Sequence, residues 1–412
     1  MKTIFINLLL AAACIMQFAS CEKGSVYNPD SISSTKDLTA PADFDWKTSE
    51  STILSITSPV STFASIYTDA ACSADSLIME NIALNANEAK EISLELPTYI
   101  TSVYVQYPTA NGTGTSEVNV GSMTRAANKS LVLPATTASN TDSDNKFTHV
   151  YYPNKNSKGT LMFEDLYPSK GDYDFNDFVI GYNVDAFFSV GSNGETRDGF
   201  TMTFQVRAIG GSLPFRPALR LKGWAMSNLE GATIEFKSTL NDINMELVSG
   251  RSGNDDVIFV INGTENLKSG GFYNTYANKT STNFPVITCK VIRNNKNDER
   301  RFLNYMSLAA ALPNYFDFFI QNTSTTDEIH FYGFGPTDMC TTQSSTTEYR
   351  DPKSKLVWAI AIPQLIAHPQ EGTDILKVYP NFKGWVSSGG NSSVDWYTKK
   401  PHDTVIDLGD ID

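Results

Sequence analysis

Residues 200–208 read Phe-Thr-Met-Thr-Phe-Gln-Val-Arg-Ala, an uninterrupted alternation of apolar and polar side chains. Successive side chains of a β-strand point to opposite faces of its sheet, so this alternation predicts a strand with one face in a hydrophobic core. Shorter alternating segments lie at 257–261 and 286–291. Two nearly continuous apolar runs, 315–320 and 356–362, are typical of central strands that are covered on both faces.

Gly and Asn turns separate these segments, and only Arg300–Leu312 and Asp374–Val378 have patterns that favour helices. Many short strands with few helices indicate an all-β fold, here a large β-sandwich or jelly roll over residues 148–412. Short strand-like runs between residues 44 and 138 predict a smaller antiparallel β-sandwich that precedes it. A polar stretch, residues 139–145, is typical of a linker between the two.

The N-terminus has the layout of a secretory signal peptide, residues 1–20, because Lys2 and the apolar run 4–18 precede two small residues. A Cys directly after those small residues is typical of bacterial lipoproteins, so we expect a lipid on Cys21 that anchors the chain in the outer membrane. A signal peptide cleaved elsewhere and a plain membrane helix are the alternatives, but the run is shorter than the roughly 20 residues that span a bilayer. Residues 21–43 are rich in Ser, Asp, Pro and Thr and predict a flexible tether.

The amino-acid composition restricts the classes of ligand that the protein can bind and the disulfides that it can form. The 412 residues carry a formal net charge of -13, which argues against nucleic acid and suits divalent cations or ligands that are neutral or basic. Cys72, Cys289 and Cys340 follow Cys21, and three cysteines form at most one disulfide within a monomer. Cys289 and Cys340 could pair in an oxidising periplasm, and buried free thiols are the alternative.

One short segment concentrates the oxygen ligands of the chain, with six oxygen-bearing side chains within 14 positions: Glu164, Asp165, Asp172, Asp174, Asn176 and Asp177. Crowded carboxylates are unfavourable unless a cation or hydrogen-bond donors neutralise them. Asp172, Asp174 and Asn176 have the one-three-five spacing that directs alternate oxygens toward one hard cation. The segment is no EF-hand, since Asp177 stands where that loop requires Gly.

We therefore predict that these six residues bind Ca²⁺. The alternative is a polar turn whose Asp and Asn side chains cap backbone groups. Tyr173, Phe175 and Phe178 are interleaved with the acids, which indicates that alternate side chains face a core while the acids face outward or toward the cation.

The strings Phe-Glu-Asp-Leu-Tyr-Pro at 163–168 and Gly-Asp-Tyr-Asp-Phe-Asn-Asp at 171–177 resemble the signature of the LruC-domain lipoproteins of Bacteroidetes. The resemblance covers about residues 148–400 and includes the later blocks 317–320 and 358–363. The sequence differs from the family pattern at His368-Pro369-Gln370-Glu371, where the family pattern has an aromatic-Pro-x-Glu stretch. The resemblance implies an extracytoplasmic β-rich domain, a motif related to suspected calcium sites, and no known reaction.

No nucleophile elbow, zinc-protease motif or phosphate-binding loop occurs in the sequence, so we expect no enzymatic activity. A third interpretation is that two of these acidic residues form the catalytic carboxylate pair of a glycosidase. Trp385, Asp395, Trp396 and Tyr397 lie in a Gly- and Ser-rich stretch and predict an exposed surface for a glycan or a protein ligand. The sequence thus favours a lipid-anchored, calcium-binding module, with a structural or adhesive subunit of a fimbria-like surface assembly as the alternative.

Overall fold

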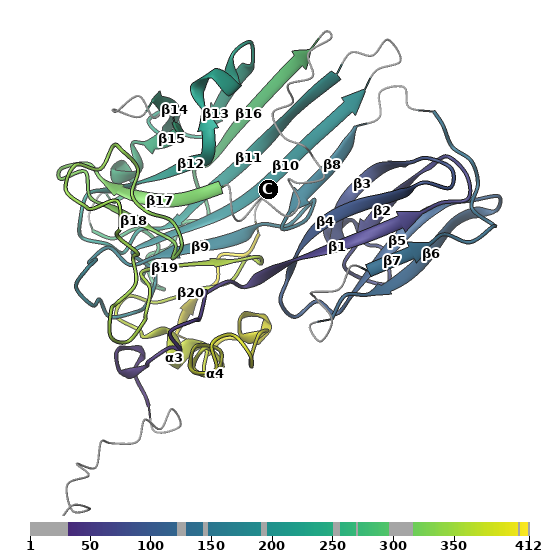
Figure 1. Ribbon diagram of the computed structural model, residues 1–412. Helices are drawn as coiled ribbons and strands as arrows, with labels where there is room; N and C mark the ends of the chain where they lie inside the picture. The colour runs from purple at the N-terminus through teal and green to yellow at the C-terminus, as the bar shows by residue number, and fades with distance from the viewer. Residues whose placement is uncertain are drawn as a thin grey trace, which may run out of the picture.

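The computed structural model describes residues 32–121, 129–142, 147–190, 196–249, 256–268, 271–295, 316–402 and 404–410. The regular secondary structure of the described chain is mostly β-strand, with only short helices (Figure 1), which confirms the predicted all-β class. Cys21, the signal peptide and the helix predicted at 300–312 lie outside the described residues. Within the described part, no helix is long and apolar enough to cross a membrane.

A small β-sandwich forms the N-terminal part of the fold, as predicted. One layer is a three-stranded sheet in the order β4-β1-β7, and the other is the end of a larger sheet in the order β3-β2-β5-β6. The strands are β1 (Ser49–Thr57), β2 (Thr62–Tyr67), β3 (Leu77–Leu84), β4 (Ala89–Pro97), β5 (Ser102–Thr109), β6 (Gly112–Asn119) and β7 (Lys129–Val132). Alternating residues of these strands face each other across the core, as the burial pattern of β5 shows.

The larger sheet has eleven strands and runs through the whole molecule. Beyond β3 it continues with β8 (Thr148–Tyr152), β10 (Phe178–Val190), β11 (Thr196–Ala208), β16 (Val286–Asn295) and β13 (Thr233–Ser238). β9 (Gly159–Phe163) joins β10 beside β8, and β19 (Ala359–Ile362) extends from β9. The alternating segment 200–208 lies in β11, where Phe200, Met202, Phe204 and Val206 are buried.

A five-stranded sheet in the order β14-β15-β12-β17-β18 packs against this large sheet. Its strands are β12 (Phe215–Ala225), β14 (Asn244–Ser249), β15 (Asp256–Asn262), β17 (Phe316–Asn322) and β18 (Glu328–His330). All seven residues of β17 are buried, as expected for the continuous apolar run at 315–320. Residues of both sheets contribute to one hydrophobic core, which includes Phe204 of β11 and Phe318 of β17.

The segment before β1 is not the free tether that the composition predicted. Residues 32–48 lie along the C-terminal helices α3 (Ile375–Val378) and α4 (Phe382–Ser387), as Figure 1 shows. Leu38, Ala40 and Phe44 are buried there, so the tether prediction is wrong for residues 32–43. α3 confirms the helix expected at 374–378, whereas α4 was not predicted. A short pair of strands, β20 (His368–Pro369) and β21 (Val405–Ile406), closes this end.

The three cysteines Cys72, Cys289 and Cys340 are free thiols. The disulfide considered between Cys289 and Cys340 is therefore absent from this structure. Burial of Cys289 in β16 raises the pKa of its thiol to about 12, so this group is neutral and behaves as a core side chain.

Candidate functional site

The acidic segment is the connection between β9 and β10. Glu164 follows the last residue of β9 and Asp177 precedes the first residue of β10, where Phe163 pairs with Phe178. The two ends are also joined directly, because the backbone N–H of Asp165 donates a 2.7 Å hydrogen bond to Oδ2 of Asp177. The long acidic turn therefore begins and ends at one point of the sheet, which folds its carboxylates back toward each other.

The backbone of the turn alternates in conformation. Tyr173 and Phe175 have φ values of 59° and 53°, a left-handed region that non-glycine residues rarely adopt. Both aromatic side chains are buried in the core beneath the turn, as the interleaved pattern predicted. Packing of these two rings holds the strained backbone, and it leaves the side chains of the intervening residues on the other side.

Three carboxylates meet there. Ligand atoms of Glu164, Asp172 and Asp174 all lie within 4.8 Å of one another, which is the spacing of oxygens that share one calcium ion with bonds of about 2.3–2.6 Å. Oε1 of Glu164 accepts a 2.8 Å hydrogen bond from the N–H of Phe175. Its Oε2 is buried and has no hydrogen-bond partner, which is costly for a carboxylate oxygen unless a cation or proton is present.

The remaining oxygens of the segment have mixed surroundings. Asp165 Oδ2 accepts a 3.0 Å hydrogen bond from the N–H of Leu213 and so ties the β11–β12 connection to the turn. Asn176 is fully buried, and its Oδ1 lacks a hydrogen-bond partner. Asp174 Oδ2 accepts from the N–H of Gly372 at 2.8 Å. The side chains of Asp165 and Asp177 thus bond to backbone groups, whereas Glu164 and Asn176 present oxygens without donors.

Glu371 is a member of this cluster that sequence reasoning did not select. It follows β20, and its Oε2 is buried without a hydrogen-bond partner. A Cβ on Gly210 would overlap both Asn176 Oδ1 and Glu371 Oε2, so these two oxygens lie beside one glycine. The only sequence signal was the aromatic-Pro-x-Glu pattern of the resemblance, which concerned alignment rather than a ligand.

Glycines line the cluster where it is tightest. A Cβ on Gly171 would overlap Glu164 Oε2, and one on Gly211 would lie 2.5 Å from Asp165 Oδ2. A side chain at any of these positions would push a carboxylate out of place. The glycines thus allow the backbone to approach oxygens that another residue would displace.

Burial and mutual repulsion make the ionised form of these carboxylates unfavourable when no cation is bound. Burial, followed by repulsion from Asp172, raises the pKa of Asp174 to about 8. Burial and the neighbouring Asp165 raise the pKa of Asp177 to about 9. Burial, with Asp177 and Asp174, raises the pKa of Glu164 well above its usual range. Among the described residues, no salt bridge involves these carboxylates, so protons or a metal cation must offset the charge.

The C-terminal aromatic residues do not form the predicted ligand surface. Trp385 and Trp396 have no exposed surface and Tyr397 is 2% exposed. The rings of Trp385 and Trp396 pack against Phe382 in the core around α4, and Tyr397 packs against Trp396. Only Asp395 reaches solvent, where it forms a salt bridge with Lys399. The expectation of exposed rings is therefore wrong, because the Gly- and Ser-rich stretch forms tight turns between α4 and the 3-10 helix Trp396–Thr398, and these turns leave the rings in the core.

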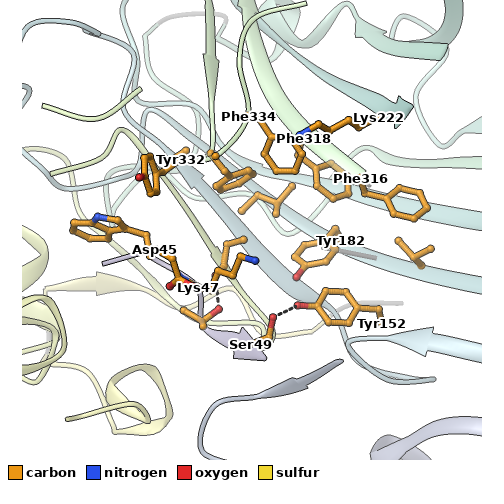
Figure 2. Close-up of a pocket in the computed structure, with 18 residues that line it drawn as sticks. Asp45, Lys47, Ser49, Tyr152, Tyr182, Lys222, Phe316, Phe318, Tyr332 and Phe334 are labelled. Atoms are coloured by element: carbon orange, nitrogen blue, oxygen red, sulfur yellow. Dashed lines mark hydrogen bonds between the residues drawn. The ribbon is translucent and has the colours of Figure 1, made fainter. Parts of the chain in front are cut away.

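A cavity of about 230 Å³ is lined by strands β8, β9 and β10 of the large sheet and by β17 of the five-stranded sheet, and Figure 2 shows its lining. Eight of the lining residues are aromatic: Trp46, Tyr152, Tyr182, Phe316, Phe318, Phe331, Tyr332 and Phe334. Tyr152 donates a 3.2 Å hydrogen bond to Oγ of Ser49 within this lining. Lys222 places its amino group 4.9 Å from the centre of the Phe334 ring. An apolar cavity with a few polar groups at its edge is the usual form of a small-ligand site.

A comparison with solved structures finds a protein of similar fold. A crystal structure described as that of a "Putative lipoprotein from Bacteroides ovatus" superposes with a TM-score of 0.67 at 20% sequence identity. The match covers 85% of this chain and 100% of that chain. At this identity the likeness is one of fold.

Two family models match parts of the sequence, and both are described as domains of unknown function. DUF4841 matches residues 62–133, within the small sandwich, and DUF4842 matches residues 198–397. No curated protein matches the chain. Neither model carries the LruC description, so that resemblance stays a prediction.

Proposed function

We propose that this protein is a lipid-anchored, extracytoplasmic binding protein whose fold is stabilised by calcium at the β9–β10 turn. The observation that carries the proposal is the buried Oε2 of Glu164, which has no hydrogen-bond partner and lies in a group with Asp172 and Asp174. A capping turn satisfies backbone N–H groups with its side-chain oxygens. This turn does so in part, yet it leaves a carboxylate oxygen of Glu164 and the amide oxygen of Asn176 buried without donors, which a capping role does not explain.

Calcium suits these ligands better than other common cations. The donors are carboxylate and amide oxygens, which hard cations prefer, and no His or Cys takes part. Calcium accepts six to eight oxygens in irregular geometry, whereas Mg²⁺ requires near-octahedral geometry and keeps several waters. A bent turn with left-handed residues at Tyr173 and Phe175 supports the more tolerant ion.

Calorimetry of residues 22–412 with CaCl₂ tests the metal. We expect binding that Asp172→Ala and Asp174→Ala abolish, and an increase of the melting temperature with millimolar calcium only in the unmutated protein. Asp75→Asn is the control, because this exposed carboxylate lies in the small sandwich and is far in sequence from the acidic turn. Unchanged melting in calcium, or binding that survives both Ala variants, would reject a calcium site in the turn.

The lipid anchor rests on the sequence of the N-terminus and is supported by the description of the Bacteroides ovatus protein of similar fold. We expect the full chain, produced in a bacterial host, to fractionate with membranes and to carry acyl chains on Cys21. Cys21→Ala should release it into the soluble extracytoplasmic fraction. Membrane association that persists in Cys21→Ala would contradict the anchor.

The aromatic cavity is the best place for a ligand. Its walls carry rings on which a sugar can stack, and the acidic chain favours neutral ligands. We expect a neutral oligosaccharide to change the fluorescence of Trp46, the tryptophan in the lining, and Phe334→Ala to weaken that binding. Phe236→Ala is the matched control, since this ring is exposed outside the cavity. Absence of binding across a panel of neutral oligosaccharides would reject a neutral glycan as the ligand of this cavity.

A further inference from the structure

Two buried oxygens of the acidic cluster lie beside the same glycine, Gly210. Asn176 Oδ1 and Glu371 Oε2 both lack a hydrogen-bond partner. Both lie where a Cβ of Gly210 would stand, so they border the same small space. Two buried acceptors that border one space repel each other unless a donor or a cation is present. Burial raises the pKa of Glu371 and a hydrogen bond from Thr275 lowers it, but Asn176 Oδ1 has no partner.

The orientation of the Asn176 amide does not remove this conflict. Its Nδ2 donates a 3.1 Å hydrogen bond to the carbonyl oxygen of Pro369, and its Oδ1 lies beside Gly210, as Glu371 Oε2 does. If the amide were rotated by half a turn, Nδ2 could donate to Glu371, but Oδ1 would then oppose the Pro369 carbonyl. Either orientation leaves one pair of buried acceptors in contact, so the mismatch does not depend on which atom is nitrogen.

This position is separate from that of the first cation. Oxygens that share one calcium ion lie within about 5 Å of each other, given bonds of about 2.3–2.6 Å. Among the described residues, the carboxylates whose ligand atoms all lie within 4.8 Å of one another are Glu164, Asp172 and Asp174, and Glu371 is not among them. One ion held by those three carboxylates therefore leaves Oε2 of the Glu371 carboxylate without a partner.

We propose that a second divalent cation binds between Asn176 Oδ1 and Glu371 Oε2, next to the first. The inference rests on the proposed function and adds a second ion to the same turn. Charge favours it, because six carboxyl groups gather here and one calcium ion offsets only two of the charges that they carry when ionised: Glu164, Asp165, Asp172, Asp174, Asp177 and Glu371. The second ion would join β20 to the turn, since Glu371 comes from outside the acidic segment.

A proton is the rival occupant. Burial and the neighbouring Asp172 raise the pKa of Glu371 to about 7, so near neutral pH its acid form could donate an O–H to Asn176 Oδ1. The two explanations differ in stoichiometry and in pH dependence. A cation is retained above pH 7 and is counted by titration, whereas a proton is lost there.

Calorimetric titration of residues 22–412 with CaCl₂ at pH 8 separates them. We expect about two calcium ions per chain in the unmutated protein and about one in Glu371→Gln, whose amide N–H can donate to Asn176 Oδ1. Glu371→Gln should also melt no lower than the unmutated protein in chelator, because the amide replaces a repelling carboxylate. Glu348→Gln, which changes an exposed carboxylate, is the control and should keep both ions.

The outcomes are distinguishable. About one ion in both the unmutated protein and Glu371→Gln would overturn the second site and leave the proposed calcium site in place. Two ions in Glu371→Gln would also overturn the role of Glu371. Absence of calcium binding in the unmutated protein would overturn the proposed function as well.

Discussion

Asp174 illustrates how a single residue couples this fold to pH. Its pKa rises from an ordinary value of 3.8 to about 8 because the carboxyl group is buried and lies beside Asp172. Between these two values the folded protein binds a proton that the unfolded chain has released. Stability that depends on this proton is therefore full at low pH and is lost as the pH rises. Asp177 and Glu371, whose pKa values are about 9 and about 7, act in the same direction.

The melting temperature in chelator should therefore fall as the pH rises from about 5 to about 9. With millimolar calcium the fall should be much smaller, because the cation replaces the protons and binds more tightly as they leave. Calorimetric scans at pH 5.5 and pH 8.5, with calcium and with chelator, measure both slopes. Parallel slopes in the two series would show that the cluster does not exchange protons for calcium.

The sequence predicted most of this site but not all of it. Spacing alone identified Asp172, Asp174 and Asn176, because alternate residues of a short turn share a side. It did not identify Glu371, which lies 194 positions beyond Asp177 in the numbering. A contact of that kind depends on how β20 is placed against the turn, and local patterns carry no information on it. The buried tryptophans near α4 were misjudged for the same reason, since only tertiary packing distinguishes a core turn from an open loop.

At the scale of elements, alternation and apolar runs were sufficient to locate strands but not to reveal charges buried within them. β17 and β18 bury Asp317, Glu328 and His330 without exposed surface. His330 lies between the two carboxylates, with Nδ1 at 2.8 Å from Asp317 and Nε2 at 2.9 Å from Glu328. Both ring nitrogens must donate, so the imidazole is charged. Burial alone would lower the pKa of His330, but Asp317 and Glu328 outweigh it and raise the pKa.

Removal of this charge should destabilise the five-stranded sheet strongly. Arg220 bonds to Oδ2 of Asp317 at 2.6 Å and does not reach Oδ1, which faces His330. The backbone N–H of Thr337 also donates to Oε2 of Glu328 at 2.6 Å, so this oxygen keeps one donor when His330 is removed, whereas Oδ1 of Asp317 loses its histidine partner. We expect His330→Gln to lower the free energy of unfolding by roughly 3–5 kcal/mol, the usual cost of breaking a buried charge pair. Urea denaturation followed by circular dichroism measures this loss.

His149→Gln is the matched control for that experiment. His149 forms a 2.7 Å pair with Asp185, but about a quarter of its side-chain surface is exposed, and exposed pairs contribute about 0–1 kcal/mol. Equal losses in the two variants would mean that the buried network adds nothing beyond a surface pair.

At the scale of the molecule, the N-terminal segment joins the two ends of the chain. Trp46 packs 5.6 Å from the ring of Trp385 and donates a 3.1 Å hydrogen bond to the carbonyl oxygen of Lys355. We expect Trp46→Ala to cost roughly 3–5 kcal/mol of unfolding free energy, as for other buried aromatic residues. Val132→Ala, at a position that is 73% exposed, should change it by at most about 0.5 kcal/mol. Denaturant titration of both variants decides whether residues 32–48 belong to the core.

The continuity of the large sheet makes a stronger prediction. β3 and β8 pair across the predicted linker, with Met79 opposite Val150 and Glu80 opposite His149. The same hydrophobic core contains Leu54 of the small sandwich and Phe178 of β10. Unfolding of either part alone would expose this shared core and break the pairing, so we expect both parts to unfold together.

Differential scanning calorimetry should accordingly show one transition, and calcium should raise the temperature of the whole transition although its proposed ligands lie in the β9–β10 turn and at Glu371. The reason is linkage, because an ion that binds only the folded state stabilises every part that unfolds with its site. Two transitions, of which calcium moves only one, would show instead that the small sandwich is an independent unit and that the β3–β8 pairing is too weak to couple it to the rest.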